Sequence, residues 1–152
     1  MSFAKKVVIA VDFTEDLPQR LKSLRKLDFL NHSELHFVHV FPTTTYPFGL
    51  GEFPLIFPME ADRDVISQSG IALLVNMTEL AMAATFVGRI IPKILFSDSE
   101  KSCFTRYVEE VHADLVIVFP RRRHGFFDSS FGEYVSKHAH SDVLFIKPKE
   151  TV

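Results

Sequence analysis

Short, continuous apolar runs that alternate with helical segments constrain the fold of this chain most strongly. The segments Lys5 to Asp12 (KKVVIAVD) and Asp114 to Phe119 (DLVIVF) are apolar throughout their centres, which is typical of strands covered on both faces. Strands of this kind occur in parallel sheets, whose crossover helices pack on the two faces. The sequence therefore predicts an α/β fold built on a parallel sheet.

The alternation of strand and helix patterns continues along the whole chain. We expect further strands at Glu34 to Phe41, Arg89 to Phe96 and Val143 to Lys147, and helices near 15–28, 59–85, 97–112 and 129–138. Pro92 cannot donate to a ladder, so its strand should lie at a sheet edge. With right-handed crossovers, the prediction is a single domain over residues 1–152, with an open five-stranded sheet in the order 3-2-1-4-5 and helices on both faces, a Rossmann-like arrangement.

In the segment at 59–85, helical spacing predicts a long amphipathic helix, with the recurring residues Ile66, Gly70, Leu73, Met77, Leu80 and Ala84. The preceding residues 42–59 hold four prolines and two glycines among large apolar residues, which predicts a long apolar loop. That loop either folds over a ligand crevice as a lid or forms part of a protein–protein interface.

Charge and composition exclude several classes of protein. The chain has 17 Lys+Arg against 19 Asp+Glu and a net charge of −2, so it lacks the basic excess expected of a nucleic-acid binder or a polybasic membrane anchor. It has no continuous apolar run of membrane-spanning length. One cysteine, Cys103, and a start without a signal-peptide pattern lead us to expect a cytoplasmic protein.

Phenylalanine is unusually abundant and unevenly placed. The chain has 16 Phe and no Trp, and eight of the 16 lie within residues 41–57 and 119–131. Both windows follow predicted strands, at the end of the sheet where ligands bind. We therefore expect aromatic side chains to crowd a ligand crevice there.

In open parallel sheets, ligands bind beyond the carboxyl ends of the strands, where the strand order reverses. Here that point lies between the first and fourth strands. The candidate binding residues are Asp12 and Phe13 after the first strand, Val40 in the second, and Val118 with Arg121, Arg122 and Arg123 at and after the fourth. The Asp12 carboxylate could instead accept hydrogen bonds from the N-terminus of the following helix. Val40 could contribute only its backbone while its side chain packs in the core.

The run Arg121 to His124 is the only dense basic segment of the chain. Guanidinium groups there could bind phosphate or carboxylate in place of backbone amides. The alternative is a solvated basic loop, or a docking site for an acidic protein partner.

The motifs as a group resemble the universal stress protein family. The resemblance rests on VDFTE at 11–15, HVF at 39–41 and the long C-terminal stretch from Val116 to Pro148, and it covers nearly the whole chain. Members that bind ATP carry a Gly-x2-Gly-x9-Gly-Ser/Thr pattern after the fourth strand. The corresponding residues here are Phe119, Arg122, Gly132 and Glu133, so one of the three glycines remains.

The loss of two of the three glycines predicts weaker phosphate binding. A glycine loop lets phosphate approach the bare backbone, whereas Phe119 would obstruct that approach unless its ring turns into the core. Glu133 would place a carboxylate beside the phosphate. The resemblance implies ATP or AMP as ligands, but the altered pattern favours no cofactor. It also implies a homodimer through the last strand, Val143 to Lys147, whose apolar edge would otherwise be exposed.

The residues show no convincing catalytic or metal-binding pattern. His36 and His39 should point to opposite faces of a strand, and no Cys or acidic residue stands at ligand spacing from His138 and His140. The resulting hypothesis is a non-enzymatic stress-response or regulatory module with weak or no ATP binding. The alternative is an adenine-nucleotide binder with altered phosphate contacts; a phosphate-transferring enzyme is a third class, without a base or nucleophile to support it.

Overall fold

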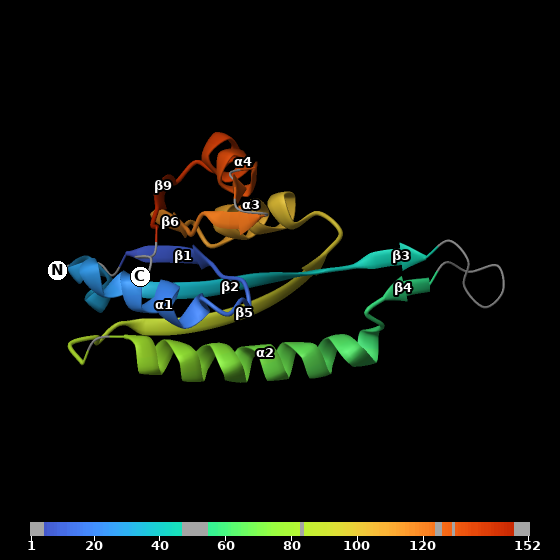
Figure 1. Cartoon of the computed structure of the whole chain (residues 1–152), viewed down its shortest axis with the longest axis horizontal. Helices are drawn as coiled ribbons and strands as arrows, with labels where there is room; N and C mark the ends of the chain where they lie inside the picture. The colour runs from blue at the N-terminus through green and yellow to red at the C-terminus, as the bar shows by residue number, and fades with distance from the viewer. Residues whose placement is uncertain (1–4, 47–54, 83, 124–125, 129, 148–152) are drawn as a thin grey trace.

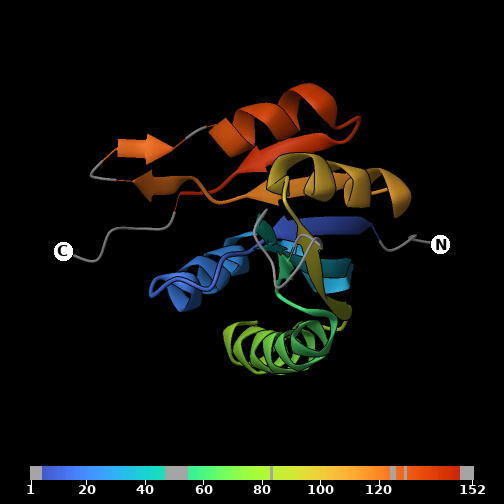
Figure 2. The same ribbon diagram turned by 90° about the vertical axis from the view of Figure 1, so that its right-hand side faces the viewer.

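The computed structural model describes residues 5–46, 55–82, 84–123, 126–128 and 130–147. For residues 45, 46, 55, 121–123 and 126–128 it describes the backbone alone. A five-stranded parallel sheet is covered by helices on both faces (Figures 1 and 2). None of the helices in these ranges combines the length and the apolar character that crossing a bilayer requires.

The sheet has the predicted strand order. Its strands are β5 (Arg89–Ser97), β2 (Glu34–Pro42), β1 (Lys6–Ala10), β6 (Leu115–Val118) and β9 (Asp142–Phe145), in that spatial order. Along the chain this is 3-2-1-4-5. Pro92 lies on edge strand β5, and β9 forms the opposite edge, both as predicted. The strand order therefore reverses between β1 and β6, as the sequence predicted.

Two apolar clusters cover the two faces of the sheet. One face packs against α1 (Leu17–Ser23), the short 3-10 turns η1 (Leu24–Lys26) and η2 (Asp28–His32), and α2 (Glu60–Ala81). The other packs against α3 (Glu100–Glu110) and α4 (Ser130–His138). Successive residues of β1 alternate between the clusters, with Val7 and Ile9 in the first and Val8 in the second.

Helix α1 is shorter than expected. The prediction was 15–28, but the α-helix ends at Ser23 and the chain tightens into the 3-10 turns. Leu27 leaves the helical region altogether, with φ −103° and ψ 89°. Leu24 and Leu30 are nonetheless completely buried, because the 3-10 turns direct these side chains into the core although the α-helix has ended.

The residues that recur at helical spacing in α2 do not all lie on its buried side. Met77 packs against the core, but the side chains of Leu73 and Leu80 are 47% and 80% exposed. Leu74, Thr78 and Ala81 are buried instead. Residues 71–75 are apolar at every position, so spacing alone could not select the buried face. Thr78 is accommodated there because its hydroxyl donates to the Leu74 carbonyl at 2.7 Å.

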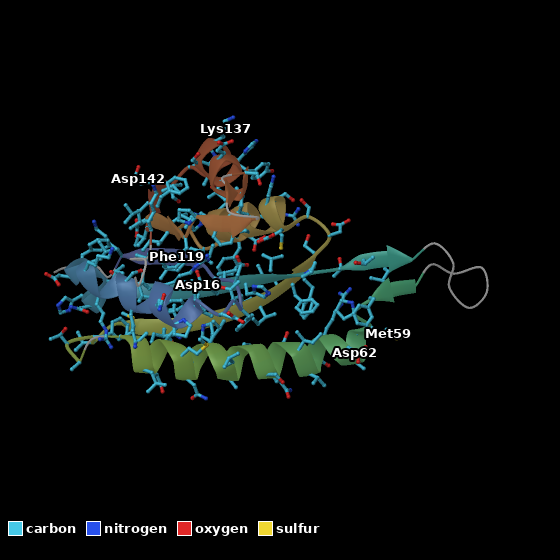
Figure 3. All side chains as sticks on the ribbon, viewed as in Figure 1. Asp16, Met59, Asp62, Phe119, Lys137 and Asp142 are labelled. Atoms are coloured by element: carbon cyan, nitrogen blue, oxygen red, sulfur yellow. The ribbon has the colours of Figure 1, made fainter. Side chains whose placement is uncertain are left out.

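Two small β-hairpins form, one in the loop predicted at 42–59 and one that includes the basic residues 121–123. Within 42–59, β3 (Thr44–Tyr46) pairs antiparallel with β4 (Leu55–Phe57), and residues 47–54 between them lie outside the described part. Figure 1 shows this hairpin extending away from the sheet, near the start of α2 that Met59 marks in Figure 3. Within 120–128, β7 (Arg121–Arg123) pairs with β8 (Phe126–Asp128).

Candidate functional site

A cavity of about 560 Å³ opens at the carboxyl ends of β1 and β2, on the face of the sheet that α2 covers. Its lining comes from the β1–α1 loop, β2, β5 and one side of α2. The residues are Asp12, Phe13, Thr14, His39, Phe41, Val65, Ile66, Ser69, Gly70, Leu73 and Ile94. The volume lies within the roughly 300–1,000 Å³ of typical small-molecule sites.

The polar end of the cavity is organised around His39. Nδ1 of His39 lies 2.9 Å from the Val11 carbonyl oxygen, and since a carbonyl can only accept, Nδ1 carries the proton. An Asp12 carboxylate oxygen lies 3.7 Å from the same nitrogen. The Phe13 ring packs edge-on against the imidazole, with 4.8 Å between ring centroids. These contacts fix the imidazole in one orientation beside the carboxylate.

Gly70 determines the apolar side of the cavity. A Cβ at this position would lie 3.0 Å from Cδ1 of Ile94 and 3.8 Å from Cζ of Phe13. A glycine within a helix costs about 1 kcal/mol relative to alanine. Here it allows α2 to approach β5 closely while Phe13 and Ile94 remain at the cavity wall.

A second polar network lies at the strand reversal itself. Arg20 is only 6% exposed, yet its Nε donates to Oδ2 of Asp16 at 2.9 Å and its Nη2 lies 3.4 Å from the Pro120 carbonyl oxygen. The guanidinium carbon also lies 5.9 Å from the centre of the Phe119 ring. Asp16 and Phe119, both labelled in Figure 3, therefore share one buried cation. The network joins the segment after β1 to the segment after β6.

The pKa of Asp16 reflects this network. Burial alone would raise the pKa of its carboxyl, but the hydrogen bond from the Thr14 hydroxyl and the charge of Arg20 outweigh burial and lower the pKa below its ordinary value. Asp16 therefore remains ionised and paired with Arg20 at neutral pH.

Phe119 and Arg122 occupy the first two positions of the glycine pattern that the family resemblance implies, and they lie just after β6 and within β7. The Phe119 ring is 3% exposed and lies in the core on the α1 face, so it does not obstruct the crevice as an outward ring would. Arg122, at the second glycine position, pairs with Phe127 inside the β7–β8 hairpin. The described backbone at 121–123 and 126–128 is extended and antiparallel.

Gly132, the retained glycine, lies in the first turn of α4 and is buried against β9. A Cβ there would lie 2.4 Å from Cε1 of Phe145. The packing of Phe145 therefore accounts for this glycine without any ligand. Glu133 follows in the same turn and is exposed.

The remaining predicted site residues separate into different parts of the molecule. Among the predicted residues, Asp12 and Phe13 line the cavity. The side chains of Val40 and Val118 belong to the core on the α3 and α4 face. Arg121, Arg122 and Arg123 form β7, and their side chains lie outside the description.

The clustered phenylalanines also separate. Phe41 lines the cavity, but Phe119 and Phe131 are core residues on opposite faces of the sheet, so these two do not crowd the crevice. Phe57 is half exposed on β4. Phe48 and Phe53, and the side chains of Phe126 and Phe127, lie outside the described residues.

The histidines of β2 point to opposite faces, as predicted. His36 contacts the Tyr107 hydroxyl and the Glu34 carboxylate, each at 2.7 Å, on the α3 face, whereas His39 faces the cavity. Within the described residues, no three His, Cys, Asp or Glu side chains gather into a potential metal site.

Sequence reasoning missed the part of the site contributed by α2. Ser69, Gly70 and Val65 gave no signal of their own as ligand contacts. His39 was considered as a metal ligand and as part of the HVF motif, but not as a cavity residue. A glycine in the middle of a long helix was the one available indication, because it predicts close approach by another element.

Comparison with known proteins agrees with this fold. The sequence from residue 4 to residue 147 matches the model of the universal stress protein family. UspA from Lactobacillus plantarum superposes with a TM-score of 0.66 at 13% identity, over 96% of this chain and 99% of that one. A search of curated proteins finds no match.

Two further similar structures are described as ligand complexes. The universal stress protein from Archaeoglobus fulgidus in complex with dAMP has a TM-score of 0.60 at 18% identity, covering 97% of this chain and 100% of that one. A universal stress protein in complex with cAMP has a TM-score of 0.59 at 13% identity, with the same coverages of 97% and 100%. Because the family model matches nearly the full length, this chain belongs to the universal stress protein family.

Proposed function

We propose that this chain is a non-enzymatic stress-response or regulatory module in which ATP binding is weak or lost. The observation that carries the proposal is the β7–β8 hairpin, which takes up the segment where ATP-binding members have their glycine loop. In the described strands of this hairpin the backbone is extended, so successive N–H groups point to alternate sides and do not converge on a triphosphate. Family membership supports the stress-response role.

Two further features support weak phosphate binding. Gly132 is accounted for by its packing against Phe145 rather than by a close approach of phosphate. Glu133 adds a carboxylate to the first turn of α4, where an ATP-binding member has a hydroxyl. Repulsion at such an exposed position weakens binding by about 1 kcal/mol, or a factor of several.

The alternative function is binding of an adenine nucleotide with fewer phosphates. Its support comes from the relatives described in complex with dAMP and cAMP, and from the position of Asp12 at the end of β1. AMP carries one phosphate and depends less on a glycine loop than ATP does. The basic strand β7 offers replacement phosphate contacts in this alternative.

Calorimetric titration separates the two functions. ATP with magnesium should give no saturable heat in the micromolar range, and protein purified without added nucleotide should release none on denaturation. Saturable binding of AMP that an Asp12→Ala variant loses would establish the alternative. Micromolar binding of ATP would overturn the proposal.

We expect the protein to be a cytoplasmic homodimer through β9. This strand forms a free edge of the described sheet, and Phe145 at its end is 46% exposed. The alternative protein-binding surfaces are the 42–59 segment and the basic segment at 121–124.

A further inference from the structure

The described lining of the cavity under α2 is mainly apolar, with an aromatic part and an aliphatic part. At the ends of β1 and β2, the Phe13 ring lies edge-on to His39, with 4.8 Å between ring centroids, and the Phe41 ring lies edge-on at 6.4 Å. The aliphatic part comes from α2 and β5 and consists of Val65, Ile66, Leu73 and Ile94. A charged group among such side chains would lose its hydration, so the lining favours an uncharged, mainly apolar ligand.

Part of this apolar lining is exposed to water. The side chains of Val65 and Leu73 are 63% and 47% exposed, and that of Phe13 is 39% exposed. Because all three line the same cavity, their exposed surfaces form one apolar region rather than scattered positions. A ligand in the cavity would remove this apolar surface from water, which is the main favourable contribution to binding in a site of this kind.

His39 provides the atom that selects a polar group on the ligand. Its Nδ1 donates to the Val11 carbonyl at 2.9 Å, so in the neutral imidazole Nε2 carries the lone pair and accepts hydrogen bonds. Nε2 points away from the Val11 carbonyl, on the other edge of a ring that lines the cavity. An acceptor in mainly apolar surroundings is best satisfied by a neutral donor on the ligand.

The other polar groups of the lining do not set this preference. The Thr14 hydroxyl donates to Asp16, and an Asp12 carboxylate oxygen lies 3.7 Å from Nδ1 of His39, so both groups interact within the protein. Ser69 on α2 adds a hydroxyl that both donates and accepts, and it therefore does not discriminate between ligands.

From this arrangement we infer that the cavity binds a neutral, mainly apolar molecule with one hydroxyl group, an alcohol or a phenol. The hydroxyl donates to Nε2 of His39, and the apolar body contacts the aromatic rings and the aliphatic side chains of α2. The inference goes beyond the proposed function. The described lining residues all lie between 12 and 94, whereas the glycine pattern falls at 119–133.

Three compounds with the same apolar body provide the test: phenylbutanol, its methyl ether and phenylbutyrate. Binding is followed at pH 8 by amide chemical shifts in two-dimensional NMR spectra of the full chain. Phenylbutanol should bind with a Kd of about 1 mM, as expected for a ligand of this size. Its shifts should centre on residues 12–14, 39–41 and 65–73.

The order of affinity tests the inferred ligand class. The methyl ether has no donor for Nε2 and should bind about threefold to tenfold more weakly than phenylbutanol. Phenylbutyrate has a charge and no donor at this pH, so it should bind at least about tenfold more weakly.

His39→Phe tests the assigned acceptor, because a phenyl ring keeps the planar shape of the imidazole and has no accepting nitrogen. Phenylbutanol should lose its advantage over the ether in this variant, while both compounds still bind. A second measurement needs no substitution. The nitrogen NMR resonance of His39 Nε2 in the parent protein should shift when phenylbutanol binds and stay unchanged with the ether at equal occupancy.

Filling the cavity gives an independent measurement of where the ligand binds. Ser69→Trp should weaken phenylbutanol binding at least about tenfold, because a single indole occupies much of the space a ligand needs. Leu80→Trp is the matched control, since Leu80 lies on the same helix, is 80% exposed and is not among the described residues that line the cavity. Both variants should show melting temperatures close to that of the parent.

The inference is wrong if phenylbutanol produces no localised shifts, if the ether or phenylbutyrate binds as tightly, or if Ser69→Trp binds like Leu80→Trp. An Nε2 resonance that does not respond to phenylbutanol would overturn the assigned role of His39. Displacement of phenylbutanol by AMP would also overturn the inference, because the cavity would then be a nucleoside site. ATP binding that leaves phenylbutanol binding unchanged would overturn the proposed function alone.

Discussion

The pair formed by Asp16 and Arg20 allows a quantitative test of how the strand reversal is held together. Asp16→Ala removes the carboxylate and leaves the Arg20 guanidinium, whose side chain is 8% exposed, without this partner. A hydrogen bond to a charged group is worth about 1.5–3 kcal/mol. Because the Asp16 side chain is itself 42% exposed, solvent screening reduces the expected loss to about 1–2 kcal/mol.

Urea unfolding measures this loss directly, and a thermal melt should show a decrease of about 2–8 °C. The pKa of Asp16 is lowered in the folded state from its ordinary value of 3.8. Its contribution is therefore fully present above that value and is lost as the pH falls through the lower, folded-state pKa. The difference between parent and variant should be constant from pH 7 to about 5 and shrink below about 4.

Glu15→Ala is the matched control, since Glu15 is an exposed acidic residue directly before Asp16. It should change the free energy of unfolding by less than about 0.5 kcal/mol. An equal loss in both variants would refute the assigned role of the ion pair. So would a difference for Asp16→Ala that does not diminish at the lowest pH at which both proteins remain folded.

Three other predictions concern a glycine, the cysteine and the dimer interface. Gly88→Ala should lower the free energy of unfolding in urea by about 2 kcal/mol or more, because its Cβ would lie 2.1 Å from the Ser33 carbonyl oxygen. Gly70→Ala meets a flexible side chain and should leave this free energy nearly unchanged, so equal losses in the two variants would contradict the reasoning. Burial raises the pKa of the Cys103 thiol, so iodoacetamide at pH 8 should alkylate the folded protein more slowly than the denatured chain, and equal rates would contradict it. At the dimer edge, the backbone N–H of Ile146 donates to the Val118 carbonyl within the sheet, so by alternation the N–H of Val143 points away from the sheet. Val143→Pro removes that donor and should give a monomer by gel filtration, while Val143→Ala should remain dimeric. A monomeric parent protein would exclude the interface.

The sheet could be predicted from the sequence because short segments of the chain identify its strands. The apolar run of β1 identifies a central strand and Pro92 identifies an edge, and the order 3-2-1-4-5 is the best arrangement that satisfies both. The faces of α2 could not be predicted in the same way. Leu73 and Leu80 have the same apolar character as Leu74, and the choice among them depends on which side meets β5.

The candidate site was predicted only in part. Asp12 and Phe13 were identified because strand ends bear ligands in this topology, and both line the cavity. The hairpin β7–β8 was not expected, since strands of three residues carry almost no pattern. The burial of Arg20 was also invisible, because a cation four residues after an acid usually indicates an exposed helical pair.

The division of the core into two clusters has a consequence for how the chain tolerates change. Val7 and Val8 are neighbours in sequence and both completely buried, yet their side chains belong to different clusters on opposite faces of the sheet. Substitutions on the two faces should therefore combine almost additively, with coupling free energies of about 0.5 kcal/mol or less. One layer can accumulate substitutions, and so reshape the cavity under α2, without repacking the layer formed by α3 and α4.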